Sequence, residues 1–174
     1  QPVKVMAMEG HYQSHPNGAP LILFGIPNSA EKRVDYALEI PKGSSLILKH
    51  EWDAPMKGLD TVPDTDEPPV GIVFWAFRVM VGVGLLMLGV SWLAVWQVRK
   101  RGLQPWLARV LVAMTFSGWV ALLAGWYVTE IGRQPWLVYG VLTTAQAAST
   151  VPAGNIALTL AMYLTMYAVL LFAY

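Results

Sequence analysis

Three long apolar segments dominate the second part of the chain. The first, residues 70–98, contains one charged residue, Arg78. At about 1.5 Å of rise per residue, a helix of this length spans roughly 43 Å, which is enough to cross a bilayer. Residues 107–129 form the second segment, and residues 156–174 form the third, which carries no charge. The pattern predicts three transmembrane helices.

The first 69 residues follow a different pattern. They hold nine of the twelve prolines and ten of the eleven acidic residues. Proline and glycine at short intervals interrupt helical and strand periodicity. Short elements are predicted at residues 3–9 (a helix end stopped by Gly10), 21–24 and 34–40 (extended), and 44–48 (helix or strand). We therefore expect a long Pro-rich, water-facing loop at residues 1–69 and a membrane region at residues 70–174.

Composition supports an all-α integral membrane protein. Hydrophobic residues make up 55% of the 174 residues and charged residues 13%, about half the charged fraction usual in soluble domains. The chain opens on Gln1 and closes on Tyr174 inside an apolar run, so we expect a piece of a larger helical bundle. Because cysteine is absent, disulfides and thiolate-bound clusters are excluded within this chain. No basic face supports binding to nucleic acid.

The basic residues predict the orientation. The connection at residues 99–109 holds four basic residues and no acidic one, and short basic connections face the cytoplasm. By alternation, residues 1–69 lie on the periplasmic side. The segment Gly132–Pro135, which should break the second helix, lies on that side too. The loop and the break can therefore form one site.

Glu130 is the single acidic residue of the membrane region. An ionisable residue at such a place is costly and is by default a functional candidate. Glu130 can be a helix-end carboxylate paired with Arg133. It can also be a metal ligand or a proton carrier, which suits a carboxylate in a poorly solvated place.

Arg78 and Met80 lie inside the first span. Arg78 can extend its side chain to the interface, or pair with a buried anion such as a haem propionate. Met80 alone indicates packing, although a thioether can be an axial haem ligand. Two residues apart on a helix, these side chains point about 200° apart, so they would flank a bound group.

The histidines are weak evidence for a metal site. His11 and His15 have the i,i+4 spacing of metal ligands, but Gly10 and Pro16 flank them, so we expect solvated loop residues. No histidine lies in a span, and a histidine-ligated cofactor would need ligands from outside this chain. Lys4 and Glu9, as bare charges, are most simply interfacial and solvated.

Three motifs carry a family resemblance. They are Gln-Pro-Val-Lys-Val-Met-Ala-Met-Glu-Gly-His at residues 1–11, Phe-Trp-Ala-Phe-Arg-Val-Met-Val-Gly at 74–82 and Gly-Trp-Tyr-Val-Thr-Glu-Ile-Gly-Arg-Gln-Pro-Trp at 125–136. In this order and spacing, the chain resembles subunit I of the cytochrome bd family of quinol oxidases. The resemblance covers the quinol-binding loop and the last three helices of that subunit. The short connection from Glu9 to Phe74 resembles the short-loop form, which includes the cyanide-insensitive oxidases.

The resemblance implies a role for each matching residue. Lys4 and Glu9 match positions linked to quinol binding and oxidation. Met80 matches the axial ligand of the low-spin haem b, and Arg78 the arginine beside it. Glu130 matches the carboxylate at a high-spin haem pair, formed by a second haem b and a haem d (or a further haem b). The residues implied around that pair are Trp126, Arg133, Gln134 and Trp136.

The resemblance also implies a function, that of a terminal oxidase in the bacterial inner membrane. Ubiquinol or menaquinol would be oxidised on the periplasmic side, and electrons would pass through the haems to reduce dioxygen to water, without proton pumping. The implied partners are subunit II, small accessory subunits, the remainder of subunit I and membrane lipid. Two alternatives come from the residues themselves. One is a transporter or channel subunit with Glu130 and Arg133 in an ion path, and the other is a purely structural membrane anchor.

Overall fold

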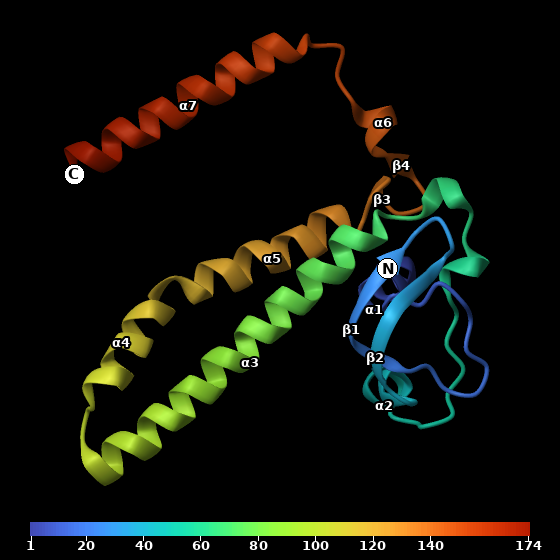
Figure 1. Ribbon diagram of the computed structural model, residues 1–174. Helices are drawn as coiled ribbons and strands as arrows, with labels where there is room; N and C mark the ends of the chain where they lie inside the picture. The colour runs from blue at the N-terminus through green and yellow to red at the C-terminus, as the bar shows by residue number, and fades with distance from the viewer.

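A pair of long helices forms the body of the molecule in the computed structural model, which describes residues 1–174 (Figure 1). Helix α3, Val70–Arg101, runs the full length of this body. Helices α4, Pro105–Ala113, and α5, Ser117–Ile131, return beside it and are joined by the 3₁₀ turn η3, Met114–Phe116. The α3–α5 pair is the largest helix–helix contact of the fold.

Three helices are long and apolar enough to cross a membrane, which confirms the predicted fold class. They are Val70–Arg101, Pro105–Ile131 and Ala153–Ala173, with mean hydropathy of 2.1, 1.8 and 2.1. The second is interrupted by η3, which the sequence did not predict. The third is α7, Ala153–Ala173, which stands apart from the α3–α5 pair and buries none of its residues (Figure 1).

The Pro-rich segment, residues 1–69, folds into a small unit at the start of α3, which we call the loop unit. Helix α1, Pro2–Glu9, ends at Gly10, which adopts a left-handed conformation with φ 74°. Strand β1, Leu21–Asn28, pairs antiparallel with β2, Arg33–Ile40. The Asn28 side chain closes their turn by accepting hydrogen bonds from the Ala30 and Glu31 amides at 3.1 and 3.2 Å. This hairpin is the main departure from an all-α fold.

Short elements complete the chain on both sides of the long helices. Helix α2, Gly43–Lys49, follows the hairpin, and the 3₁₀ turns η1, Leu59–Thr61, and η2, Asp64–Asp66, lead into α3. Between α5 and α7 lie β3, Trp136–Val138, β4, Leu142–Thr143, and α6, Thr144–Ala147.

A buried apolar cluster joins the loop unit to the long helices. Ile131, at the end of α5, packs against this cluster. Its members come from α1, the segment after α1, η1 and the first turn of α3: Val3, Met6, Ala7, Tyr12, Leu59, Val70 and Val73. The end of α1, the start of α3 and the end of α5 are therefore held together.

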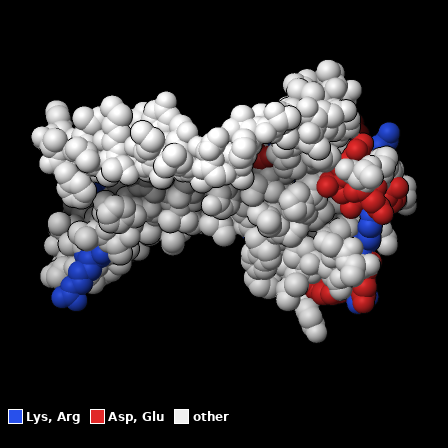
Figure 2. Space-filling view, turned by 90° about the horizontal axis from the view of Figure 1, so that it is seen from above, with Lys and Arg blue, Asp and Glu red and all other residues white.

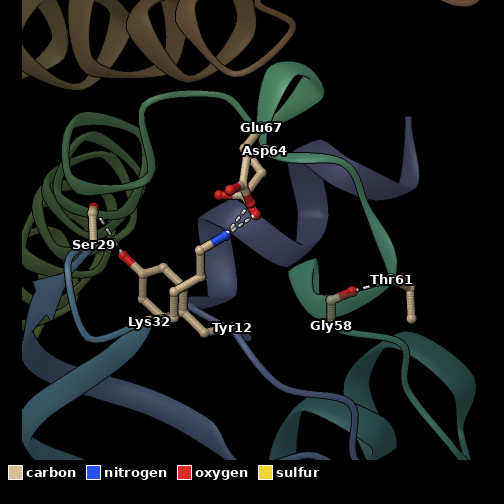
Figure 3. Close-up of polar contacts among 7 residues, drawn as sticks. All are labelled: Tyr12, Ser29, Lys32, Gly58, Thr61, Asp64 and Glu67. Atoms are coloured by element: carbon tan, nitrogen blue, oxygen red, sulfur yellow. Dashed lines mark hydrogen bonds and ion pairs between the residues drawn. The ribbon is translucent and has the colours of Figure 1, made fainter.

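Polar contacts fasten the hairpin turn to the segment that precedes α3 (Figure 3). The Lys32 ammonium contacts Asp64 at 2.6 Å and Glu67 at 2.7 Å. On the other side of the turn, the Tyr12 and Ser29 hydroxyl oxygens lie 3.3 Å apart. These contacts hold the loop unit in one position relative to α3.

Charge is divided between the two ends of the molecule. Acidic side chains gather at the loop end, and a basic group lies at the opposite end, where α3 finishes (Figure 2). The last turn of α3 supplies Arg99, Lys100 and Arg101. Between Arg78 and Arg99, α3 carries no charge, and this stretch of roughly 30 Å by helical rise matches the apolar thickness of a bilayer.

Candidate functional site

A cavity of about 310 Å³ lies between the loop unit and α3. Glu9, Ser44 and Arg78 supply its polar atoms, and most of the remaining wall is apolar, including Leu48 of α2 and Leu85 of α3. An apolar cavity with a few converging polar groups is the usual form of a small-molecule site. Its lining suits a largely apolar molecule with a polar group at one end.

Glu9 is the acid of this cavity. Its side chain is only 6% exposed, and Oε2 has no hydrogen-bond partner. Burial raises the pKa of Glu9, and the Arg78 charge and the Ser44 hydroxyl oppose that shift. The Ser44 hydroxyl, on α2, lies near enough to Glu9 to lower its pKa, but it forms no hydrogen bond of normal geometry with Glu9 or with any other group. Two unsatisfied oxygens facing one cavity indicate a place where a ligand's hydroxyl groups can bind.

Arg78 links three elements at the edge of the same cavity. Its Nη1 donates to the Met8 carbonyl at 2.8 Å and to the Phe74 carbonyl at 3.0 Å, and its Nη2 donates to the Ile22 carbonyl. The guanidinium also lies over the Phe74 ring, 3.2 Å from its centre. Arg78 therefore fastens α1 and β1 to α3, while its Nε remains buried without an acceptor.

Lys4 lies on a different side of α1 from Glu9. Its side-chain stem packs on the end of α5, where a β-carbon added to Gly132 would lie 3.0 Å from Lys4 Cγ. Five residues along a helix turn a side chain by about 140°, which explains the separation. Lys4 does not line the Glu9 cavity. The structure thus brings Lys4 toward the break after α5.

Glu130 lies in the last turn of α5 and forms an ion pair with Arg133. The Gln134 side chain donates to the Glu130 carbonyl at 3.3 Å, and the Thr144 hydroxyl lies 2.6 Å from Gln134 Oε1. The segment after α5 is therefore folded back on the helix end. The Glu130 side chain stays 41% exposed, so its carboxylate remains accessible to a further group.

Tryptophans flank the Glu130 region. Trp126 lies one turn earlier on α5 and is exposed. Trp136 begins β3, and its ring centre lies 6.0 Å from that of Tyr139. The indole Nε1 of Trp136 and the Nε of Arg133 are both buried without an acceptor. Two unsatisfied donors in the segment that follows Glu130 indicate a missing acceptor.

Met80 faces α5, away from the loop. A β-carbon added to Gly125 would lie 2.9 Å from the Met80 sulfur, so glycine is what allows the sulfur to lie against the α5 backbone. Arg78, two residues earlier, reaches toward the loop unit. The two side chains diverge as helical spacing predicts.

These groups fit a haem protein. No three His, Asp or Glu side chains gather as a metal cluster, but a haem iron needs only one or two axial protein ligands, and a thioether can be one of them. A haem also carries propionate acceptors. The unsatisfied donors of Arg78, Arg133 and Trp136 suit such carboxylates.

Two residues of the loop unit have surroundings that the sequence does not predict. Ser44 carried no motif, and its burial depends on how α2 packs against β1. His11 was expected to be solvated, which is wrong because it is 2% exposed, with Nε2 2.9 Å from the Pro20 carbonyl. The expected absence of a helix there is correct, since α1 ends at Glu9.

Comparison with known proteins identifies relatives over the whole chain. The family model for cytochrome bd terminal oxidase subunit I matches residues 1–174. The cytochrome bd ubiquinol oxidase subunit 1 of Bacillus subtilis is 31% identical over 182 residues, covering 98% of this chain and 39% of its own length. The cytochrome bd-II ubiquinol oxidase subunit 1 of Escherichia coli is 27% identical over 240 residues, covering 99% and 47%.

The fold also matches a solved structure. The bd oxidase of Geobacillus thermodenitrificans superposes with a TM-score of 0.77 and 34% sequence identity, over 99% of this chain and 40% of that one. The chain therefore spans less than half of the length of each of these relatives.

Proposed function

The chain belongs to the cytochrome bd terminal oxidase subunit I family, and from this we propose that it supplies the quinol-oxidising loop and part of the haem-binding region of a bd-type terminal oxidase. Quinol is oxidised at the loop end, and dioxygen is reduced to water. One observation carries the proposal. Arg78 borders the cavity of the buried Glu9 carboxylate, while Met80, two residues further along α3, presents a thioether beside α5.

The two ends of the molecule give the proposed orientation. Residues 1–69 and the Glu130 region lie on the periplasmic side, and residues 99–109 face the cytoplasm. The basic last turn of α3 supports this, because short basic connections remain on the inner side of bacterial membranes. Protons from quinol then leave on the outside. Protons for water formation come from the inside, so the reaction separates charge without a pump.

The haems supply one-electron transfer and oxygen reduction when bound. Met80 would supply a thioether ligand to the iron of a low-spin haem b. Glu130 is the proposed carboxylate at a high-spin haem b paired with a haem d or a further haem b. Four residues around Glu130 would hold and orient these groups: Trp126, Arg133, Gln134 and Trp136.

The chain's own residues have separate tasks at the quinol site. Glu9, buried in an apolar cavity and with a raised pKa, accepts a proton from a quinol hydroxyl. Arg78 fixes the position of that cavity through its bonds to loop carbonyls. Lys4, on another side of α1, is proposed to favour quinol binding from the direction of the α5 end. The substrate is ubiquinol or menaquinol, and the partners are subunit II, small accessory subunits, the rest of subunit I and lipid.

A reduced-minus-oxidised optical spectrum of the complete membrane protein tests this function. Haem b bands, with or without a haem d band, and oxygen consumption driven by quinol are expected. A spectrum without haem bands would contradict the proposal, and would favour a transporter subunit with Glu130 and Arg133 in an ion path, or a membrane anchor.

A further inference from the structure

A second cavity, of about 190 Å³, lies beside the Glu9 cavity within the loop unit. His11 and His15 line it, together with charged side chains of the β1–β2 hairpin. Ile22 lines both cavities, and Glu9 of the first is separated from His11 of the second by Gly10 alone along the chain. A carboxylate in an apolar cavity thus has a polar, histidine-lined cavity as its neighbour.

One ring nitrogen of His11 has a hydrogen-bond partner, and the other has none. Its Nε2 lies 2.9 Å from the Pro20 carbonyl oxygen, which can only accept, so Nε2 carries the proton. Nδ1 is then a lone-pair acceptor, and it is buried without any donor. A buried, unpaired nitrogen is costly when a histidine serves only for packing. Its position suits a group that receives a proton during turnover.

We propose that His11 and His15 carry the protons released by quinol oxidation from Glu9 to the water outside the loop unit. The inference rests on the proposed quinol oxidation, for which it supplies the proton exit. His11 accepts at Nδ1, and His15, whose ring centre lies 5.3 Å from that of His11, passes the proton to solvent. His15 is partly exposed, as the last carrier must be.

In each proton transfer, one bond to hydrogen breaks and another forms. A quinol O–H bond breaks as an O–H bond forms at Glu9 Oε2, and the electrons leave through the haems to dioxygen. The Glu9 proton then moves to His11 Nδ1, giving an imidazolium that keeps its Nε2 bond to Pro20. The imidazolium releases that proton toward His15 and water. Glu9 and His11 are then ready for the second proton.

Burial brings the pKa values of the proton donor and acceptor closer together, because it raises the pKa of Glu9 and lowers the pKa of His11. These shifts reduce the driving force from Glu9 to His11, so the proton moves between more closely matched groups, and its release to the water beside His15 gives the transfer its direction. Burial is the main cause for His11, and nearby His15 and Arg78 lower its pKa further. The other titratable groups that face the cavity are Tyr12, Lys32, Arg33 and Glu39.

The test is His11→Gln in the complete oxidase. The glutamine amide can still donate to the Pro20 carbonyl but cannot titrate. His50→Gln is the matched control, because His50 is exposed and lines neither cavity. In His11→Gln we expect quinol-driven kcat to fall about ten-fold or more, with an enlarged solvent deuterium isotope effect. The quinol KM, the haem spectrum and oxygen consumption from a donor that reduces the haem directly should match those of His50→Gln.

The outcomes separate this inference from the proposed function. A wild-type oxidase that does not oxidise quinol would overturn both. A wild-type oxidase that does, with His11→Gln indistinguishable from His50→Gln, would overturn the histidine route alone. If His11→Gln does not assemble with its haems, His15→Gln is measured in its place to test the histidine route. A normal kcat and a normal isotope effect in that variant would overturn the route.

Discussion

The sulfur of Met80 lies against the backbone of Gly125, where a β-carbon would come within 2.9 Å of it. The contact joins the first half of α3 to α5 and fixes where the thioether points. The position of the proposed haem ligand therefore depends on a glycine in the neighbouring helix.

Gly125→Ala should displace the Met80 side chain. Methionine is flexible, so the protein should still assemble, at a cost of about 1–3 kcal/mol from overpacking. We expect an altered low-spin haem spectrum. Gly84→Ala is the control, because nothing lies within 4 Å of a β-carbon there. Identical spectra in the two variants would show that the Met80–Gly125 contact does not position the ligand.

Met80→Leu tests the ligand itself. Leucine has a similar volume but no donor atom, so the packing cost should stay below about 1.5 kcal/mol. The low-spin haem should become high-spin or be lost while the subunit assembles. Met87→Leu, on the same helix and exposed, should keep the normal spectrum. An unchanged low-spin signal in Met80→Leu would exclude the ligand role.

Ser44→Ala should move the pH dependence of quinol oxidation. The Glu9 carboxylate must be ionised to accept a proton, so activity is lost as pH falls through its pKa. Because the Ser44 hydroxyl lowers that pKa against the effect of burial, its removal should shift the acid limb of kcat/KM to higher pH. The measurement is oxygen consumption with quinol across a pH series.

Ser45→Ala is the neighbouring control. The Ser45 hydroxyl bonds the Ala19 amide at 2.7 Å and the Ala54 carbonyl at 2.9 Å, so its loss should lower stability by about 1–3 kcal/mol. It should leave the acid limb in place. Equal shifts in both variants would mean that loop disruption, and not the Glu9 environment, moves the profile.

Lys4→Ala should raise the quinol KM several-fold and change kcat less, because Lys4 lies away from the Glu9 cavity. Its stem also packs on Gly132, so Lys4→Met, which keeps much of the stem, separates charge from packing. A KM increase in both variants supports a role of the charge. An increase in Lys4→Ala alone would point to packing at the α5 end.

The long helices were predictable from the sequence, and so were the short elements of the loop unit, which the structure has as α1, β1, β2 and α2. The way these short elements pack together was not predictable. A bilayer sets the length and polarity of a spanning helix, so the composition of residues 70–98 is enough to predict a transmembrane helix there. The turn η3 carries no proline or glycine, and it has no comparable signal. The hairpin depends on contacts such as the Lys32–Glu67 pair, which joins residues 35 positions apart.

In the candidate site, too, features set by helical spacing were predictable and features set by tertiary packing were not. Helical spacing alone predicts that Lys4 and Glu9 diverge and that Arg78 and Met80 do too. Burial of His11 and Ser44 follows from tertiary packing around Pro20 and α2, which local patterns do not encode. The flanking residues of His11 correctly indicated a loop, but a loop residue becomes buried when other segments cover it.

Glu130→Gln is the decisive test of the proposed oxygen-reducing site. Glutamine preserves the shape of Glu130 but removes its charge and its titratable proton. The ion pair with Arg133 is partly exposed, at 41% and 32% for the two side chains, so breaking it should cost at most about 1 kcal/mol. Arg133→Gln breaks the same pair and keeps the carboxylate, which makes it the matched comparison.

A haem-site carboxylate predicts a larger loss from Glu130→Gln than from Arg133→Gln. The high-spin haem spectrum should change and oxygen reduction should fall strongly, while the Met80 haem remains present and reducible by quinol. A structural ion pair predicts similar, small effects of both changes, because either one removes the same contact. Near-normal oxygen turnover in Glu130→Gln would therefore reject the assignment, whatever the effect of Arg133→Gln.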